Sequence, residues 1–392
     1  MNKPEVNEKQ NKKPYGRRTA AILLMIAGLL FSVWFMQRFM CIPFSYDEIR
    51  TINFHKEPEN SIDVLLVGSS ATYSDFSSAC AYEKFGFTSY PYAIGGATST
   101  MWKPAVQDAL DTQRPKLVVV DVFGGAYERD LIDTRSNQLS IVYSHTAFSE
   151  EKLDSIAESC SLVEDTSEES FLFPFIKYHN NVPACIPDLP DRLVLEFSGP
   201  SPLKGVNTHT RSRWLMPVDP ASFTDETAPL DEKNEKIILD FIDYCKSEDL
   251  EVLFVKYPMV LSDDYPEELE MNLRANRILE IARENGCGAL NMQKHFNDMH
   301  LKELRDFYNH GHANTRGQIK ITEFLGRYIQ DEMGIGPSEL SESDKAAWDE
   351  AVVWWNAFRD MTLEEIRDNK IEDVGDSPAL VRRMEALVGD SR

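Results

Sequence analysis

Three apolar segments that each end in small residues constrain the fold of this chain most strongly. The segments and the residues after them are 62–67 with Gly68-Ser69-Ser70, 88–93 with Gly95-Gly96, and 116–123 with Gly124-Gly125. Apolar runs of this length are typical of strands that are covered on both faces. A helical pattern at 99–110 separates the second from the third. This alternation predicts a parallel sheet with helices on both sides.

The alternation stops after the third strand and resumes about a hundred residues later. Residues 126–229 are rich in Ser, Asp and Pro, and we interpret them as an insertion with short helices. Further strands are then expected at 251–257 and 288–292, and helices at 231–247, 268–285 and 315–333. Pro91 favours an edge position for the second strand, because proline cannot donate to a sheet ladder. We expect residues 61–335 to form a three-layer α/β/α domain with a flavodoxin-like parallel sheet.

The last part of the chain has a different pattern. Residues 336–392 follow Gly336-Pro337 and carry Trp348, Trp354 and Trp355 on amphipathic helical segments. We expect a helical C-terminal extension that packs on the domain, and a surface for a partner is the alternative.

The N-terminus joins a basic tail, residues 1–18, to an uncharged apolar run, residues 19–36. Such a run rises about 27 Å as a helix, close to the thickness of the hydrocarbon core. Basic residues before it predict a cytoplasmic N-terminus and an extracytoplasmic main domain. A cleaved signal peptide is the alternative, but bulky residues follow where small ones are usual. Residues 37–60 are expected to form a membrane-proximal linker.

Charge and cysteine content exclude several classes of function. The formal charge of −23 argues against nucleic acid as a partner, because phosphate binding needs a basic surface. None of the six cysteines forms a Cys-x-x-Cys pair, which argues against a zinc or redox motif. We expect several of them to be buried as small apolar residues. No cofactor is expected.

The candidate chemistry lies in two separate segments. Ser70 follows its strand directly, at the carboxyl edge where parallel sheets bind ligands. His312 lies in a polar loop before the last predicted helix, and a histidine there is expected to reach the same edge. A serine hydroxyl needs such a base to become a good nucleophile. The alternative for Ser69 and Ser70 is simple capping of a helix.

With these residues the chain resembles the SGNH (GDSL-type) hydrolases, most closely their membrane-anchored, extracytoplasmic bacterial branch. That branch includes proteins of lipoteichoic-acid D-alanylation and exopolysaccharide O-acetylation. The resemblance covers residues 60–333 and implies that Ser70 is the nucleophile and His312 the base. It also implies that the N–H groups of Ser70 and of Gly95 or Gly96 bind the oxyanion.

Two departures from the family pattern leave alternatives open. The acid that the family places three residues before the histidine is replaced by Asn309. Asparagine can orient the imidazole but cannot stabilise imidazolium by charge. Asp306 is the alternative partner of His312, and His310 is an alternative base. The asparagine that completes the family's oxyanion hole is also missing, since Gly124-Gly125 stand at the matching strand end.

Two further polar groups give weaker hypotheses. Arg211, Arg213 and Trp214 form a basic and aromatic cluster that suits a phosphate or a sugar ring, or else a surface loop of the insertion. His310 and His312 are spaced to share a metal ion, but no third ligand is evident, and we expect no metal site.

These observations predict a cell-surface serine esterase or O-acyltransferase that acts on acyl esters of envelope glycans or polymers. The resemblance implies a membrane-bound O-acyltransferase as a partner. The alternative is a catalytically decayed, membrane-anchored module that binds an envelope polymer or an acylation partner.

Overall fold

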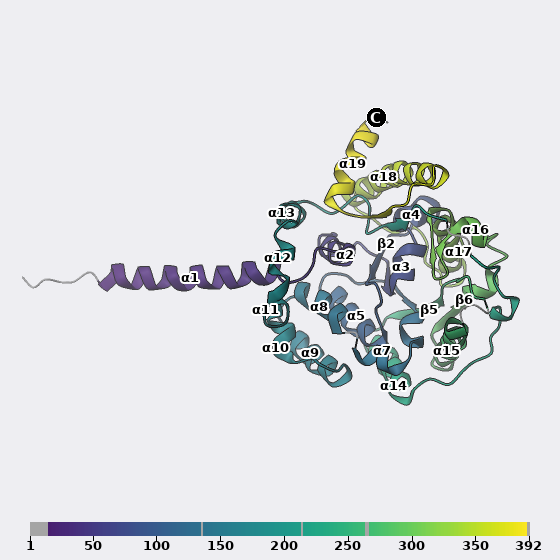
Figure 1. Ribbon diagram of the computed structural model, residues 1–392, viewed down its shortest axis with the longest axis horizontal. Coiled ribbons are helices and arrows are strands. Elements are labelled where there is room, and N and C mark those ends of the chain that lie inside the picture. Colours follow the sequence, from purple (N-terminus) through teal and green to yellow (C-terminus); the bar gives the residue numbers. More distant parts are fainter. Residues whose placement is uncertain (1–14, 135, 213–214, 263–265, 390–392) are drawn as a thin grey trace, which may run out of the picture.

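Five parallel strands form the centre of the molecule. The computed structural model describes residues 15–134, 136–212, 215–262 and 266–389 (Figure 1). The strands of the sheet are, in chain order, β1 Val64–Gly68, β2 Ser89–Ala93, β3 Leu117–Asp121, β5 Glu251–Lys256 and β6 Gly288–Asn291. Their order in the sheet is β2-β1-β3-β5-β6, the flavodoxin-like order of doubly wound folds. The predicted fold class is confirmed.

The edge position of β2 agrees with its proline. β2 pairs on one side only, with Leu66 of β1 opposite Pro91. On its other side β1 pairs with β3, where Val64 lies opposite Leu117. Every residue of β1, β2 and β3 is buried, because helices cover both faces of the sheet.

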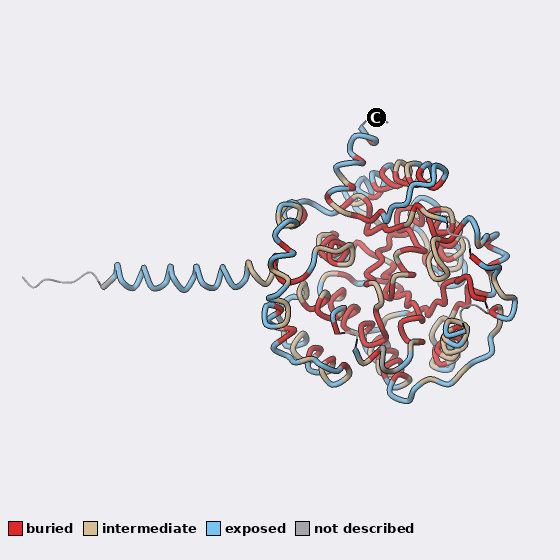
Figure 2. The backbone as a smooth tube through the Cα atoms, viewed as in Figure 1, coloured by how far each residue is buried: buried red, intermediate tan, exposed pale blue. Residues whose placement is uncertain are grey.

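Two helical layers enclose the sheet. One face carries η1 Ser99–Met101 with α5 Trp102–Leu110, then α14 Glu232–Ser247 and α15 Pro266–Glu284. The other face carries α3 Ser70–Asp75, α4 Ser78–Phe85 and α17 Thr315–Asp331. Figure 2 shows the buried core between these layers. Asn314 caps α17, as a residue with a short polar side chain before a helix is expected to do.

The segment between β3 and β5 consists mainly of short helices. They are α6 Phe123–Ala126, α7 Arg129–Thr134, α8 Ser136–His145, α9 Glu150–Leu162, α10 Glu168–Leu172, α11 Pro174–Tyr178, η2 His179–Asn181, α12 Val182–Cys185, α13 Leu189–Phe197 and η3 Pro220–Ser222. A short strand, β4 Asn207–His209, lies among them. After β6 come η4 Met292–His295, α16 Glu303–Asp306, and the strands β7 Phe307–Asn309 and β8 His312–Ala313.

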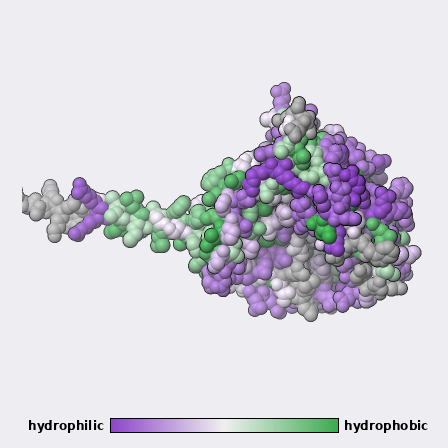
Figure 3. Space-filling model, turned by 45° about the horizontal axis from the view of Figure 1, so that its top comes forward, coloured by the Kyte–Doolittle hydropathy of each residue, from purple (hydrophilic) through white to green (hydrophobic). Residues whose placement is uncertain are grey.

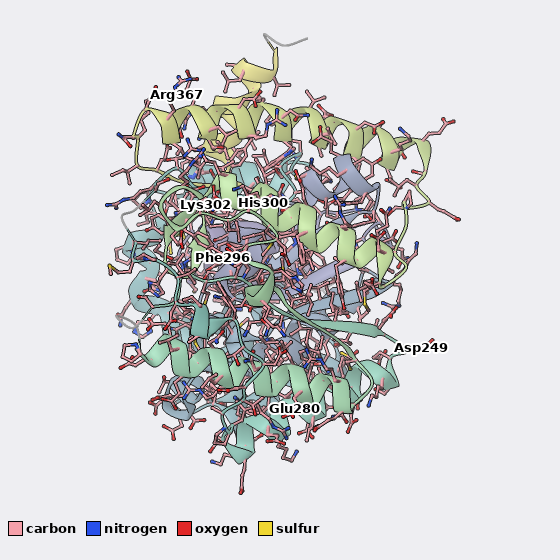
Figure 4. All side chains as sticks on the ribbon, turned by 90° about the vertical axis from the view of Figure 1, so that its right-hand side faces the viewer. Asp249, Glu280, Phe296, His300, Lys302 and Arg367 are labelled. Atoms are coloured by element: carbon pink, nitrogen blue, oxygen red, sulfur yellow. The ribbon has the colours of Figure 1, made fainter. Side chains whose placement is uncertain are left out.

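The C-terminal extension forms a further layer over α4. Its elements are α18 Glu342–Arg367, β9 Asp373–Gly375 and α19 Pro378–Gly389. Seen from the side opposite α1, α18 with Arg367 at its end lies across the top, and α15 with Glu280 lies across the bottom (Figure 4). The extension is not only helical, because β9 pairs antiparallel with β4. All three tryptophans of α18 are buried against the domain.

The N-terminal helix α1, Tyr15–Phe39, projects from one side of the domain (Figure 1). Within the described residues it is the helix whose length and apolar composition, over Gly16–Phe39, fit a membrane span or a signal sequence. The next segment corrects an expectation. Residues 37–60 are not a plain linker, because α2, Tyr46–Phe54, is folded into the domain with its last seven residues buried.

Candidate active site

The turn after β1 fixes the position of Ser70. Gly68 has a φ of +155°, and a Cβ on it would lie 2.4 Å from Cβ of Asp121, so this close approach requires glycine. Ser69 then donates its hydroxyl to Oδ2 of Asp121 at 2.5 Å and its N–H to the same oxygen at 3.1 Å. Ser70 follows as the first residue of α3, where backbone N–H groups lack an intrahelical acceptor.

His312 lies in the hairpin of β7 and β8, directly before α17. This hairpin is tied to α3, because the N–H of Ala313 donates to Oδ1 of Asp75 at 2.9 Å. Asp75 is the last residue of the helix that Ser70 begins. A single buried carboxyl group therefore connects the segment of the serine to the segment of the histidine.

The two predicted reactive groups are in hydrogen-bond contact. Oγ of Ser70 lies 2.6 Å from Nε2 of His312. On the other side of the ring, Nδ1 of His312 lies 2.9 Å from Oδ1 of Asn309. The same oxygen accepts the N–H of Gly311 at 2.9 Å, which identifies the Asn309 atom as an acceptor. Nδ1 must therefore carry the proton, and the free lone pair of Nε2 faces the serine hydroxyl.

Burial keeps the imidazole of His312 neutral. It lowers the pKa of His312 to about 4, and the neighbouring His209 and His310 add to the effect. His209 stacks on Tyr308 at 3.8 Å between ring centroids, and burial lowers its pKa to about 4 as well. At neutral pH His312 is thus an acceptor for a proton, as a general base must be.

Asp306, the other candidate partner of His312, is engaged elsewhere. Its Oδ2 accepts the N–H of Lys302 at 2.8 Å and the Lys320 ammonium at 2.6 Å. Its side chain is buried in that ion pair. The hydrogen bond to Nδ1 comes from Asn309 instead, because the loop places residue 309 beside the ring.

The expected oxyanion role of Gly95 conflicts with its hydrogen bond. The N–H of Gly95 donates to Oδ2 of Asp47 at 3.1 Å. Nη1 of Arg50 donates to Oδ1 of Asp47 at 2.9 Å, and the guanidinium lies over the ring of Tyr73. Helix α2 therefore occupies the end of β2, where the sequence predicted a free donor. The oxyanion roles of Gly96 and Ser70 stay predictions.

A cavity of about 690 Å³ opens beside Ser70 and His312. Its apolar lining includes Phe123, Met259 and Met271, and its charged lining consists of Glu128, Glu267, Glu268 and Arg274. Neither Gly95 nor Gly96 is among the residues that line it.

The other predicted site residues contribute little to this cavity. His310 lines it but pairs with Glu268 at 3.3 Å. Arg211 does not line it, and its carbonyl accepts a hydrogen bond from Asn314 at 3.2 Å. Arg213 and Trp214 lie outside the described residues. The predicted substrate-binding role of this cluster therefore has no support from the position of Arg211.

Two residues that position the site, Asp121 and Asp75, were missed from the sequence. Asp121 is a single acid at the end of a buried strand, and that isolated charge was a usable signal. Asp75 gave no such signal, because its partner, Ala313, is far away in the chain. His209, from the polar segment that also contains Arg211, lies in β4, which pairs with the C-terminal strand β9.

Comparisons with known proteins match this chain to solved structures, at low sequence identity in those named below. No family model matches the chain, and no curated protein matches it. Solved structures similar to it include an acetylxylan esterase from Geobacillus stearothermophilus, with 11% identity, a TM-score of 0.35, and coverage of 72% of this chain and 99% of that one. A GDSL-like lipase from Bacteroides thetaiotaomicron has 11% identity, a TM-score of 0.31, and coverage of 69% and 88%. An acetyl xylan esterase from Butyrivibrio proteoclasticus has 11% identity, a TM-score of 0.28, and coverage of 71% and 66%.

Proposed function

We propose that this protein is a serine esterase or O-acyltransferase whose nucleophile is Ser70. The observation that carries the proposal is the 2.6 Å contact between Oγ of Ser70 and the unprotonated Nε2 of His312. A neutral imidazole that is oriented on its other nitrogen is the arrangement that activates a hydroxyl group.

In the proposed reaction, Oγ of Ser70 attacks the carbonyl carbon of an ester while Nε2 of His312 takes the hydroxyl proton. The N–H of Ser70 stabilises the oxyanion of the tetrahedral intermediate. His312 then gives its proton to the leaving alcohol, and the acyl group remains on Ser70. A water or a second hydroxyl, deprotonated by His312, then attacks the acyl carbon, the bond to Oγ of Ser70 breaks, and His312 returns the proton to Oγ.

Asn309 limits how well His312 can act as a base. Its Oδ1 orients the ring, but an amide does not stabilise the imidazolium that forms in the reaction. Burial, with His209 and His310 nearby, lowers the pKa of His312 to about 4, which makes it a weak base. The site is therefore suited to esters, whose leaving groups need less assistance than those of amides.

The cavity and the N-terminal apolar helix support a proposal for the substrate class. Apolar side chains beside Ser70 suit a small acyl group. An anchored, extracytoplasmic domain would meet acylated glycans or other envelope polymers at the cell surface. A membrane-bound O-acyltransferase is the partner that the sequence resemblance implies.

Hydrolysis of p-nitrophenyl acetate by the full-length protein in detergent micelles tests the proposal. Ser70→Ala should lower kcat/KM by at least about 10³-fold, because the nucleophile is lost. Ser343→Ala, which changes an exposed serine of α18, is the matched control and should leave kcat/KM unchanged. Equal activity of wild type and Ser70→Ala would overturn the proposal and favour a non-catalytic binding module.

A further inference from the structure

An apolar surface surrounds the point where α1 enters the domain. Helices α10 to α13 lie along the side of the domain from which α1 projects (Figure 1). Figure 3 shows hydrophobic residues gathered where α1 meets the domain. Six large apolar side chains of this region are 40% to 80% exposed, and we call them the collar: Phe173, Phe175, Ile176, Ile186, Val194 and Phe197.

The collar is held rigidly against the end of α1. Nδ2 of Asn181 donates to the carbonyl of Cys41 at 3.0 Å, and Arg192 donates to the carbonyl of Ile42. Arg38, in the last turn of α1, forms an ion pair with Glu196 of α13 at 2.9 Å. Residues 39–42 are buried in this junction. The direction of α1 and the position of the collar are therefore fixed relative to each other.

The length of α1 determines how far the domain stands from a membrane that α1 crosses. Its exposed uncharged part, residues 19–34, rises roughly 24 Å at about 1.5 Å per residue. The hydrocarbon core is about 30 Å thick, so no exposed helix remains to separate the domain from the lipid. Trp34, at the end of the exposed part, is of the residue type that favours the interface. The collar then lies at the level of the headgroups.

From this geometry we infer that the collar is a second membrane contact, inserted in the interface beside α1. Its occupant is the lipid surface itself, and large exposed apolar patches commonly mark such contacts. Charge does not drive the contact. Two acids near the collar are paired with arginines, Glu196 with Arg38 and Asp191 with Arg382, and the chain as a whole is acidic. The inference depends on α1 crossing the membrane and is independent of the chemistry proposed for Ser70.

Quenching by brominated lipid tests this contact in the full-length protein. Single tryptophans are added as Phe197→Trp and Ile176→Trp, both at exposed collar positions. Each variant is placed in nanodiscs of phosphatidylcholine with or without bromine near the glycerol end of the acyl chains. The fluorescence that each added tryptophan contributes over the parent protein should be lost in the brominated discs.

The matched control is Ile371→Trp, which lies 67% exposed before β9 on the C-terminal extension. Its added fluorescence should be the same in both kinds of disc. Equal behaviour of the collar and control tryptophans would overturn the inference, whether water or a protein covers the collar. Raising NaCl from about 0.1 M to about 1 M should leave the quenching unchanged, and its loss would show an electrostatic contact instead.

Discussion

Two regions of this molecule bury a histidine among polar partners, the Ser70–His312 pair and the junction of α1 with the domain. Burial lowers the pKa of His312 at the first and of His145 at the second, so both rings are neutral. Their partners differ. His312 contacts a hydroxyl and an amide, whereas His145 contacts the guanidinium of Arg38. The junction also contains two ion pairs that attach α1 and α2 to α13: Arg38–Glu196 at 2.9 Å and Arg192–Glu48 at 2.6 Å.

The difference shows that buried polar groups can either hold two elements together, as at the junction, or remain available for a reaction, as at the Ser70–His312 pair. At the junction the guanidinium groups of Arg38 and Arg192 face carboxylates, and the lone pair of His145 is used by Arg38. At the site the lone pair of His312 faces a hydroxyl that can give up its proton. The ion pairs at the junction make separation of α1 from the domain unfavourable in free energy. At the uncharged site, His312 remains available as a general base.

The largest difference between the two histidines should appear in catalysis. His312→Ala should lower kcat/KM for p-nitrophenyl acetate by about 10² to 10⁴-fold, because the general base is lost. His145→Ala should leave kcat/KM of the folded protein within about twofold, because this ring touches no reacting group. Similar losses in the two variants would contradict the comparison.

Changes at the junction should affect the free energy of unfolding rather than catalysis. Arg192→Met leaves the buried carboxyl group of Glu48, whose pKa burial raises to about 8, without its partner and should lower the free energy of unfolding by about 1–3 kcal/mol. The double variant Glu48→Met/Arg192→Met should recover much of this loss, because neither charge remains buried. Denaturant unfolding of the full-length protein in micelles measures both values. If Arg192→Met were as stable as wild type, the Arg192–Glu48 pair would not stabilise the junction.

Asn309 and Asp306 offer a sharper test within the site. Asn309→Asp adds a negative charge beside Nδ1 of His312, which should raise the pKa of the ring and increase kcat/KM about tenfold or more. Asp306→Asn should leave kcat/KM unchanged and lower stability by about 1–3 kcal/mol, because the Lys320 ammonium loses its partner. The reverse pattern would identify Asp306 as the functional acid.

The pH dependence of wild-type activity should reveal the neutral base. Only the unprotonated form of His312 accepts the serine proton, so kcat/KM should fall as pH drops through about 4. Above that pH, up to about neutrality, it should be constant. A half-point near the ordinary histidine value of about 6.5 would mean that burial does not depress this pKa.

The sequence allowed most of the sheet to be predicted, and it pointed to Ser70 and His312, whose side chains are in contact. Apolar strands and glycine-ended turns are local signals, and Pro91 marked the edge strand because its effect is local too. Helix α2 was missed because its buried charges, such as Glu48, are paired with residues more than a hundred positions away. That same helix brings Asp47 to Gly95. One missed helix therefore explains why residues 37–60 are not a plain linker and why the N–H of Gly95 already has an acceptor.

The sequence could not distinguish Asn309 from Asp306 as the partner of His312 for a similar reason. Both residues precede His312 in one loop, and nothing local shows which side chain reaches the ring. Lys320, on the helix that follows, decides the matter by binding Asp306. Strand β9 was missed because three residues give too short a pattern, and only its pairing with β4 defines it.

Reaction with a fluorophosphonate tests most directly whether Ser70 is an activated nucleophile. Such a probe forms a covalent bond with a serine hydroxyl whose proton is taken by a neighbouring base. Mass spectrometry of the treated full-length protein should show one adduct, located on Ser70 and absent from Ser70→Ala and His312→Ala. Folded wild-type protein that gains no adduct, or gains it equally in Ser70→Ala, would contradict the account.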